Sequence, residues 1–385
     1  MKRIYLDYAA TTPVDQKVAF AMEKYLSVNF GNANATHSFG QSAAAALDSG
    51  RAQVAQSLSA NEDQIIFTGS ATEANNLALR GVVARARANG RKNPQIIVSS
   101  IEHESVLATA KNLAQHGVKV LFLPVTKSGI VDLAALEKAL TKETVLVSLM
   151  YANNEVGTIQ PISKIAALIK AQKIGSYPLF HTDAVQAFPY LSCEIDQLGV
   201  DLLTISSHKM YGPKGAAALF CKDRSLLAPI ITGGGQEFSL RSGTENLPAI
   251  VGFAKATEIA AKMRIKEGAR LAILQKYLFG GLRSIFPNSR INGSTKNRLP
   301  NNLNILFPGY AATDLLIGLD LAGIAVSAGS ACAASANKPS QVLAAIGLSS
   351  QEAKSSLRIT LGRQTKKADL NRLLQELKRL KNRLK

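Results

Sequence analysis

The stretch QIIVSSIEHESVLATAKNLAQHGVKVLFLP (95–124) contains one whole strand–helix–strand unit. Its apolar runs at 95–100 and 118–124 predict strands, and residues 104–116 between them have the apolar spacing of an amphipathic helix. Because a strand followed by a helix and a second strand favours a parallel pair, this unit predicts part of a parallel sheet.

The same alternation extends over residues 60–225. Further apolar runs predict strands at 64–68, 144–150, 178–183, 201–206 and 215–221. Helical patterns cover 72–90, 132–140 and 161–174. We therefore expect an α/β fold whose large domain has a mainly parallel seven-stranded sheet flanked by helices. In such sheets ligands bind beyond the carboxyl ends of the strands.

The pattern changes after residue 250. A helical stretch at 251–284 is followed by an apolar run at 302–307, a helix at 312–322, the small-residue loop SAGSACAAS (327–335) and the strand-like SSLRIT (355–360). This order predicts a smaller α+β domain. We expect the large domain to cover residues 15–255, and the smaller one to combine residues 1–14 with 256–385.

Composition excludes several classes of protein. Among the 385 residues, 46% are hydrophobic and 19% charged, which allows a substantial core and excludes a disordered or fibrous chain. No apolar run reaches the roughly 18 residues of a membrane span, and the N-terminus lacks a secretory signal pattern. Three cysteines with no zinc-type spacing predict neither a disulfide framework nor a metal site. We expect a cytoplasmic protein.

The formal net charge of +18 raises the question of a nucleic-acid partner. Residues 363–385 hold nine Lys or Arg and two Asp or Glu, with leucines at helical spacing. This pattern favours an amphipathic terminal helix whose basic face is solvated. Nucleic acid is not the expected partner, although an acidic protein or tRNA stays open as a ligand of that face.

Two strand ends carry the sharpest chemical signal. Lys209, in SSHKMYGPKG (206–215), directly follows a predicted strand and is a candidate Schiff-base nucleophile. Alone it could equally be a surface lysine. Asp183 ends another strand, in HTDAVQ (181–186), where a carboxylate can pair with a protonated pyridine nitrogen. A lysine and an aspartate so placed are the protein half of pyridoxal-phosphate chemistry.

That cofactor also needs an anion site. TGSATEANN (68–76) joins a strand to a helix and offers backbone amides, Ser70 and Thr72 at the helix N-terminus. A turn of this kind is often only a helix cap. Ser206 and His208, which flank the lysine, could add phosphate contacts. No nucleotide-binding glycine motif occurs.

Other polar residues follow the predicted strands. His103 could stack on a cofactor ring and move protons near neutral pH, or merely cap a helix. Asn154 and Gln186 could hydrogen-bond the hydroxyl of the ring. Arg358, within a strand-like run, could clamp a substrate carboxylate, and a structural ion pair is the alternative.

The cysteines differ in setting. Cys332 lies in a loop of nine small residues with no bulky anchor, which suits a nucleophile that visits a site and then leaves it. Cys221 ends an apolar strand and is expected to be a core residue. Cys193 is assigned no role.

These segments together resemble the cysteine desulfurases, in the class V aminotransferase group of fold-type I pyridoxal-phosphate enzymes. The similarity is collinear over nearly the whole chain: YLDYAATTP, GNANATH, TGSATEANN, IEHESV, NNEVG, HTDAVQ, SSHKMYGPKG, GGGQE with RSGTEN, SAGSACAAS and SSLRITLGR. The SAGSAC loop is similar to that of the NifS/IscS-like group. Two departures are the order Gly69–Ser70 in the cradle and Ala33, where the family commonly has proline.

The resemblance implies a role for each position. Lys209 would bind the cofactor covalently, Asp183 would hold its ring nitrogen, His103 would stack on the ring and move the substrate thiol proton, and Cys332 would form a persulfide. The other implied contacts are Gln186 and Asn154 to the ring hydroxyl, Ala71, Thr72, Ser206 and His208 to the phosphate, Thr244 to the phosphate of the other subunit, and Asn32 and Arg358 to the substrate carboxylate.

The implied function is desulfuration of L-cysteine to L-alanine by a homodimer, with transfer of sulfur to an acceptor such as an iron–sulfur scaffold or a tRNA-thiolation protein. A selenocysteine lyase or an aminotransferase on the same scaffold is the nearest alternative. A basic scaffold or RNA-binding protein without catalysis is the alternative from another class, and the presence of Lys209 and Asp183 argues against it.

Overall fold

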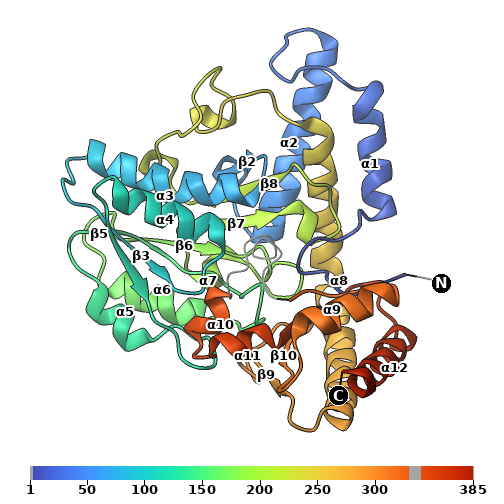
Figure 1. Ribbon diagram of the computed structural model, residues 1–385. Helices are drawn as coiled ribbons and strands as arrows, with labels where there is room; N and C mark the ends of the chain where they lie inside the picture. Colours follow the sequence, from blue (N-terminus) through green and yellow to red (C-terminus); the bar gives the residue numbers. More distant parts are fainter. Residues whose placement is uncertain (1–2, 329–339, 385) are drawn as a thin grey trace.

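The computed structural model describes residues 3–328 and 340–384 of the chain (Figure 1). Seven strands form the central sheet, in the order β2-β8-β7-β6-β5-β3-β4. They are β2 (Ile65–Thr68), β3 (Gln95–Ser99), β4 (Lys119–Leu123), β5 (Thr144–Ser148), β6 (Leu179–Asp183), β7 (Leu202–Ser206) and β8 (Ala217–Cys221). Strands β7, β6, β5, β3 and β4 are parallel neighbours, and β8 pairs antiparallel with both β7 and β2. The predicted seven-stranded, mainly parallel sheet is confirmed.

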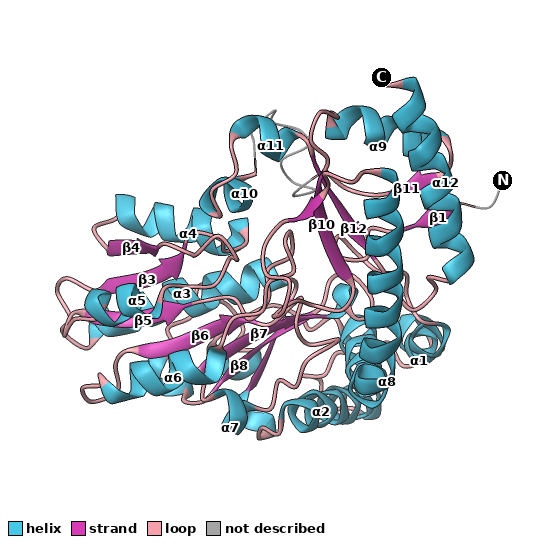
Figure 2. Cartoon of the chain, turned by 90° about the horizontal axis from the view of Figure 1, so that it is seen from below, coloured by secondary structure: helices cyan, strands magenta, loops and turns pink. Residues whose placement is uncertain are grey.

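Helices cover both faces of this sheet (Figure 2). One face packs on α3 (Ala71–Ala88) and α4 (Glu104–Gln115), whose Leu77 and Val106 belong to one buried cluster. The other face packs on α2 (Ser38–Leu58), α5 (Leu133–Ala139), α6 (Ile162–Ala171), α7 (Ile195–Leu198) and the start of α8 (Leu247–Ile285). Successive apolar residues of one strand, such as Ile65 and Ile66 of β2, enter different clusters, so the strands have apolar side chains on both faces of the sheet.

A second group of elements forms a separate buried cluster. It includes an antiparallel sheet of β9 (Arg290–Ile291), β10 (Asn302–Leu306) and β12 (Ser356–Thr360), and the parallel pair β1 (Ile4–Tyr5) and β11 (Ile324–Ala325). Helices α9 (Ala312–Leu321) and α12 (Lys367–Arg383) and the second half of α8 pack here. Two short helices, α10 (Gln341–Ala345) and α11 (Ser350–Lys354), follow residues 329–339.

The 39-residue helix α8 joins the two groups (Figure 2). Near its start, Ile250 and Phe253 are buried against the large sheet. Near its end, Leu271, Leu278 and Leu282 are buried in the second cluster. One continuous helix therefore contributes to both cores.

The two longer helices that were not expected from the sequence are α1 (Gln16–Ser27) and α2, and the short helices α7, α10 and α11 were not expected either. The buried face of α2 contains small residues such as Gly40, Ala43 and Gly50, which give weak hydrophobic contrast. Small side chains allow close approach of a neighbouring helix, and a Cβ on Gly50 would lie 3.3 Å from a methyl group of Ile250 on α8. Among the described residues, none of the helices combines the length and apolar composition needed to cross a bilayer.

A buried ion pair holds the glycine-rich segment 233–246 against the large sheet. Arg51 on α2 donates from both terminal nitrogens to the Glu237 carboxylate, at 2.7 and 2.8 Å, and Glu237 also accepts the backbone N–H of Phe67 at 2.7 Å. Glu237, Phe238 and Ser239 have φ of 46°, 60° and 62°, a left-handed conformation that costs free energy in residues with a side chain. The ion pair offsets that cost.

This geometry predicts the effect of breaking the pair. Glu237→Ala leaves the Arg51 guanidinium buried without its counter-ion, and we expect a loss of about 3–5 kcal/mol of unfolding free energy in urea titrations. The exposed pair Arg379–Glu376 on α12 provides the control, since Glu376→Ala should cost less than about 1 kcal/mol. Equal losses in the two variants would contradict a special contribution of the buried pair.

Candidate active site

A cavity of about 510 Å³ lies where residues that follow β2, β3, β6 and β7 come together with residues of the second group. Nine of the residues expected from the sequence line it: Ala71, Thr72, His103, Asn154, Asp183, Gln186, His208, Lys209 and Arg358. Three others do not. Ser206 is buried at the end of β7, while Asn32 and Thr244 are exposed. Cys332 lies outside the described residues.

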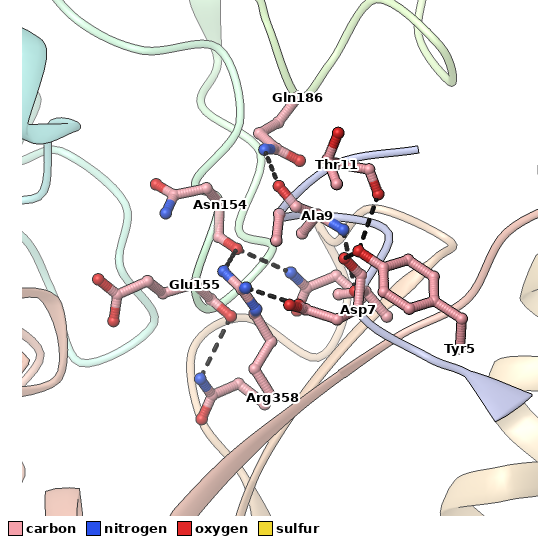
Figure 3. Close-up of polar contacts among 12 residues, drawn as sticks. Tyr5, Asp7, Ala9, Thr11, Asn154, Glu155, Gln186 and Arg358 are labelled. Atoms are coloured by element: carbon pink, nitrogen blue, oxygen red, sulfur yellow. Dashed lines mark hydrogen bonds and ion pairs between the residues drawn. The ribbon is translucent and has the colours of Figure 1, made fainter. Parts of the chain in front are cut away.

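Lys209 is at the end of a 3₁₀ turn (Ser207–Lys209) that begins directly after β7. Its ammonium donates hydrogen bonds to the carbonyl oxygens of Ala9 and Ala10, at 2.7 and 2.6 Å. The Ala9 carbonyl also accepts the side-chain amide of Gln186 at 3.0 Å (Figure 3). The N-terminal segment therefore fixes the position of the lysine amine at the cavity wall.

Asp183 ends β6 and is buried. One carboxylate oxygen accepts the backbone N–H of Val185 at 3.0 Å, and the other accepts the amide of Asn75, on α3, at 2.8 Å. These donors hold the carboxylate in one orientation at the cavity.

The turn before α3 offers an anion site. Ser70 caps the helix by accepting the N–H of Glu73 at 3.2 Å, and the N–H of Gly69 donates to the Glu73 carboxylate at 3.0 Å. Arg241, from segment 233–246, donates to the same carboxylate at 2.7 Å. A Cβ on Gly69 would lie only 3.0 Å from Glu73, so glycine suits this close approach. Ala71 and Thr72 form the first turn of α3 and line the cavity, where the helix dipole favours an anion.

Two histidines on the cavity wall are held neutral by burial. Burial lowers the pKa of His103, and the nearby Asp183 and Lys209 act on it in opposite directions. Burial and the charges of Lys209 and Lys214 lower the pKa of His208 to about 4. His208 also bonds through Nδ1 to the Thr11 hydroxyl at 3.1 Å.

Arg358, on β12, is 2% exposed and is oriented by two acceptors (Figure 3). It donates to the backbone oxygen of Asn154 at 3.0 Å and to the Asp7 carboxylate at 2.8 Å. Its Nε has no hydrogen-bond partner among the described residues. The structure thus confirms the strand position and also shows the ion pair that was the alternative explanation for this arginine.

Asp7, Glu102 and Glu155 were not among the residues expected to form the site. Asp7 is part of YLDYAATTP, and the two glutamates adjoin the expected His103 and Asn154, so adjacency to those motifs was the available signal. Burial raises the pKa of Glu155, which accepts the Ser340 hydroxyl at 2.5 Å. Burial raises the pKa of Glu102 to about 8 against the opposing hydrogen bonds from Ser99 and Met150.

Comparison with known proteins identifies the family. Residues 4–373 match the family Aminotransferase class-V. This chain belongs to that family, within its cysteine desulfurase group. It is 43% identical to cysteine desulfurase IscS of Dictyoglomus turgidum, covering 100% of this chain and 96% of that protein, and 43% identical to cysteine desulfurase IscS 1 of Archaeoglobus fulgidus, covering 97% and 95%.

Solved structures show the same fold. A NifS-like protein superposes with a TM-score of 0.92 at 34% identity, covering 99% of this chain and 100% of that one. SspA in complex with cysteine has a TM-score of 0.82 at 36% identity, covering 94% and 99%. The resemblance to NifS/IscS-like class V aminotransferases inferred from the sequence is therefore confirmed.

Members of this family, cysteine desulfurases included, are pyridoxal 5′-phosphate enzymes. The residues present fit that cofactor. The cavity offers a lysine amine, a carboxylate already held by two donors, and a helix N-terminus suited to a phosphate. Among the described residues, no cluster of His, Cys, Asp and Glu is arranged to hold a metal ion.

The buried carboxyl of Glu102 predicts a pH-dependent stability. Since its folded pKa is about 8 and the unfolded value about 4.5, the folded state binds the extra proton between these values. The contribution of Glu102 to stability is thus fully present below pH 4.5 and is lost as the pH rises towards 8. Glu102→Gln keeps an acceptor for Ser99 and Met150 without ionising. Its unfolding free energy from urea titrations, relative to the unsubstituted chain, should rise between pH 5 and 8 by an amount on the order of 1–4 kcal/mol. A difference independent of pH would contradict the buried neutral carboxyl.

Proposed function

We propose that this chain is a pyridoxal-phosphate-dependent enzyme that removes sulfur from L-cysteine, giving L-alanine and a persulfide on Cys332. The observation that carries the proposal is the meeting of Lys209, Asp183 and the α3 N-terminus around one cavity. Full-length similarity to proteins named cysteine desulfurase supports the choice of reaction. SspA, a structural relative, is described in complex with cysteine, which supports the choice of substrate.

The residues expected from the sequence have proposed parts in holding the cofactor. Lys209 binds it covalently, Asp183 pairs with the ring nitrogen, and His103 stacks on the ring. Gln186 and Asn154 contact the ring hydroxyl, and the phosphate is held by Ala71, Thr72, Ser206 and His208, together with Thr244 of the partner subunit. When bound, pyridoxal phosphate withdraws electrons from the α-carbon of an amino acid.

The chain's own residues carry the remaining steps. Arg358 and Asn32 bind the substrate carboxylate and so fix the amino acid in the cavity. The Lys209 amine removes the α-proton, and the Ala9 and Ala10 carbonyls hold that amine in place. The Cys332 thiolate attacks the substrate sulfur, so that an S–S bond forms while the C–S bond breaks and its electron pair stays on carbon. His103 acts at the substrate thiol. The sulfur acceptor we propose is a protein such as an iron–sulfur scaffold.

A homodimer fits an exposed apolar region near α1. Phe20 is 79% exposed, Leu26 67%, Phe30 66% and Phe39 55%. Large apolar side chains gathered on adjoining segments are typical of a protein interface. We propose that a second copy covers them and brings the exposed Thr244 to its cavity.

We also propose that the protein is cytoplasmic and that it divides into two domains. A reducing cytoplasm fits the two described cysteines, Cys193 and Cys221, which are buried free thiols rather than a disulfide. Cys221 is thus a core residue, as expected. Division into a large domain (15–255) and a smaller one (1–14 and 256–385) is supported by their separate buried clusters.

The reaction is tested by product analysis. We expect the purified protein with pyridoxal phosphate, L-cysteine and a thiol reductant to form alanine and sulfide in equal amounts, and Cys332→Ser to lose sulfide production by at least 100-fold while keeping the bound cofactor. Keto-acid products without sulfide would favour an aminotransferase. Turnover of selenocysteine with unchanged rate in Cys332→Ser would favour a selenocysteine lyase. A protein that binds no pyridoxal phosphate would support a non-catalytic basic scaffold.

The Asp7–Arg358 pair predicts a selective effect on substrate binding. Asp7→Ala removes a charge-assisted hydrogen bond that orients the guanidinium, and we expect KM for L-cysteine to rise roughly 10-fold or more with a smaller change in kcat. Asp7→Asn, which keeps an acceptor, should lie between. Asp15→Asn is the matched control, since Asp15 pairs with Arg363 and does not line the cavity. A lower KM in Asp7→Ala would instead show that Asp7 competes with the substrate for Arg358.

A further inference from the structure

Four groups form a hydrogen-bonded chain that links His103 to Asp183. The Asn75 amide nitrogen lies 2.8 Å from the Asp183 carboxylate and 2.9 Å from the Ser105 hydroxyl. That hydroxyl lies 2.8 Å from Nδ1 of His103. The backbone N–H of Ser105 also points at Nδ1, at 3.1 Å, and His103 thereby caps the N-terminus of α4.

The direction of every bond in this chain is fixed by chemistry. A backbone N–H can only donate, so Nδ1 of His103 must accept and carries no proton. The Asn75 amide nitrogen likewise can only donate, and its two hydrogens go to Asp183 and Ser105. The Ser105 hydroxyl therefore accepts from Asn75 and donates its own hydrogen to Nδ1. Neutral His103 must then hold its proton on Nε2, the ring nitrogen left for the cavity that His103 lines.

Asn75 does not favour the stability of the folded state at this position. It is fully buried, and its carbonyl oxygen has no hydrogen-bond partner among the described residues. An unpaired buried carbonyl destabilises the folded state, whereas an apolar side chain of the same size would leave no polar atom unpaired. The two bonds donated by Asn75 therefore point to a positioning role.

We propose that Asn75 and Ser105 are positioning residues that hold neutral His103 in the Nε2–H tautomer, so that His103 meets the substrate sulfur as a hydrogen-bond donor. This inference rests on the proposed desulfurase function and refines it. With its proton already on Nε2, neutral His103 cannot accept the thiol proton at that nitrogen, so this proposal differs from the proton-moving role that the family resemblance implies. The thiol proton goes to water, and the Nε2–H stabilises the resulting thiolate.

The charges around His103 agree with a neutral ring. Asp183 faces it from β6, Lys209 from the turn after β7, and Glu104 from its own helix. Burial has the largest effect and lowers the pKa of His103. The neighbouring Glu102 directs one carboxyl oxygen to Ser99 and Met150 instead.

The tautomer can be measured directly in the holoenzyme. The chain has five histidines, so selective ¹⁵N-histidine labelling and long-range ¹H–¹⁵N correlation spectra give few signals, and His103→Gln identifies those of His103. We expect an unprotonated Nδ1 and a protonated Nε2 between pH 7 and 8 without substrate. A proton on Nδ1, or an even mixture of tautomers, would overturn the proposal.

Variants of the network give the second readout. In Ser105→Ala the hydroxyl donor to Nδ1 is lost and the backbone N–H donor stays, so we expect the pKa of His103 in these spectra to rise by roughly 0.5–1 unit. Asn75→Leu frees the Ser105 hydroxyl to rotate away from Nδ1, so the pKa of His103 should also rise, while the backbone N–H of Ser105 keeps Nδ1 unprotonated in the neutral ring. Thr109→Val is the matched control, since it removes a buried hydroxyl of α4 that bonds only to the helix backbone. Identical spectra in Ser105→Ala and Thr109→Val would contradict the network.

Kinetics then separate a donor from a base. His103→Gln keeps an N–H near the position of Nε2, whereas His103→Phe keeps a ring without one. We expect kcat for sulfide release at least 10-fold higher in His103→Gln than in His103→Phe. A base would be lost equally in both, so equal rates would reject the donor role. If the protein releases no sulfide at all, the proposed function fails, whereas the spectra still decide the tautomer.

Discussion

The geometry of the site depends on how the N-terminal segment is held between the two groups of elements. Leu6 extends the second group through its backbone bonds to Ala325 and Thr360, and Thr12 bonds to the backbone of His208 beside the lysine. Between these anchors, the carbonyls of Ala9 and Ala10 hold the Lys209 amine. Because residues 6–12 are held at both ends, this segment cannot shift without moving β12 or the turn that carries Lys209. The lysine and the arginine are therefore positioned by one shared element rather than by their own loops.

Two of the carboxyl groups that line the cavity, Asp183 and Glu102, differ in their surroundings. Asp183 accepts hydrogen bonds from an amide and a backbone N–H and interacts electrostatically with His103. Glu102 is fully buried, one of its oxygens has no partner among the described residues, and burial raises its pKa to about 8. Desolvation opposes a charged carboxylate, so Glu102 is a neutral acceptor below about pH 8, whereas the donors around Asp183 fix the orientation of its carboxyl group.

Much of this arrangement could be predicted from the sequence. The apolar strands of a parallel sheet end on polar residues, and Lys209, Asp183 and His103 occupy three of those ends, so their meeting in one cavity followed from topology. The helices α1 and α2 could not be predicted as easily, because the buried face of α2 uses alanine and glycine. The contacts of Asp7 and Asn75 could not be predicted either. Each acts through another residue, and such a partnership depends on contacts between segments that are far apart in the sequence.

The tautomer of His103 also depends on contacts between segments that are far apart in the sequence. The sequence shows that a histidine follows a strand. Which of its ring nitrogens carries a proton depends on the hydrogen-bond partner of the other nitrogen. Here the helix that begins at His103 supplies a backbone N–H, and a residue thirty positions earlier fixes the serine that supplies the second donor. Because α3 packs beside α4, the cap, the serine and the amide form one unit with the aspartate. The helix packing that builds the core on this face of the sheet thus also places both Ser105 donors at Nδ1 of His103.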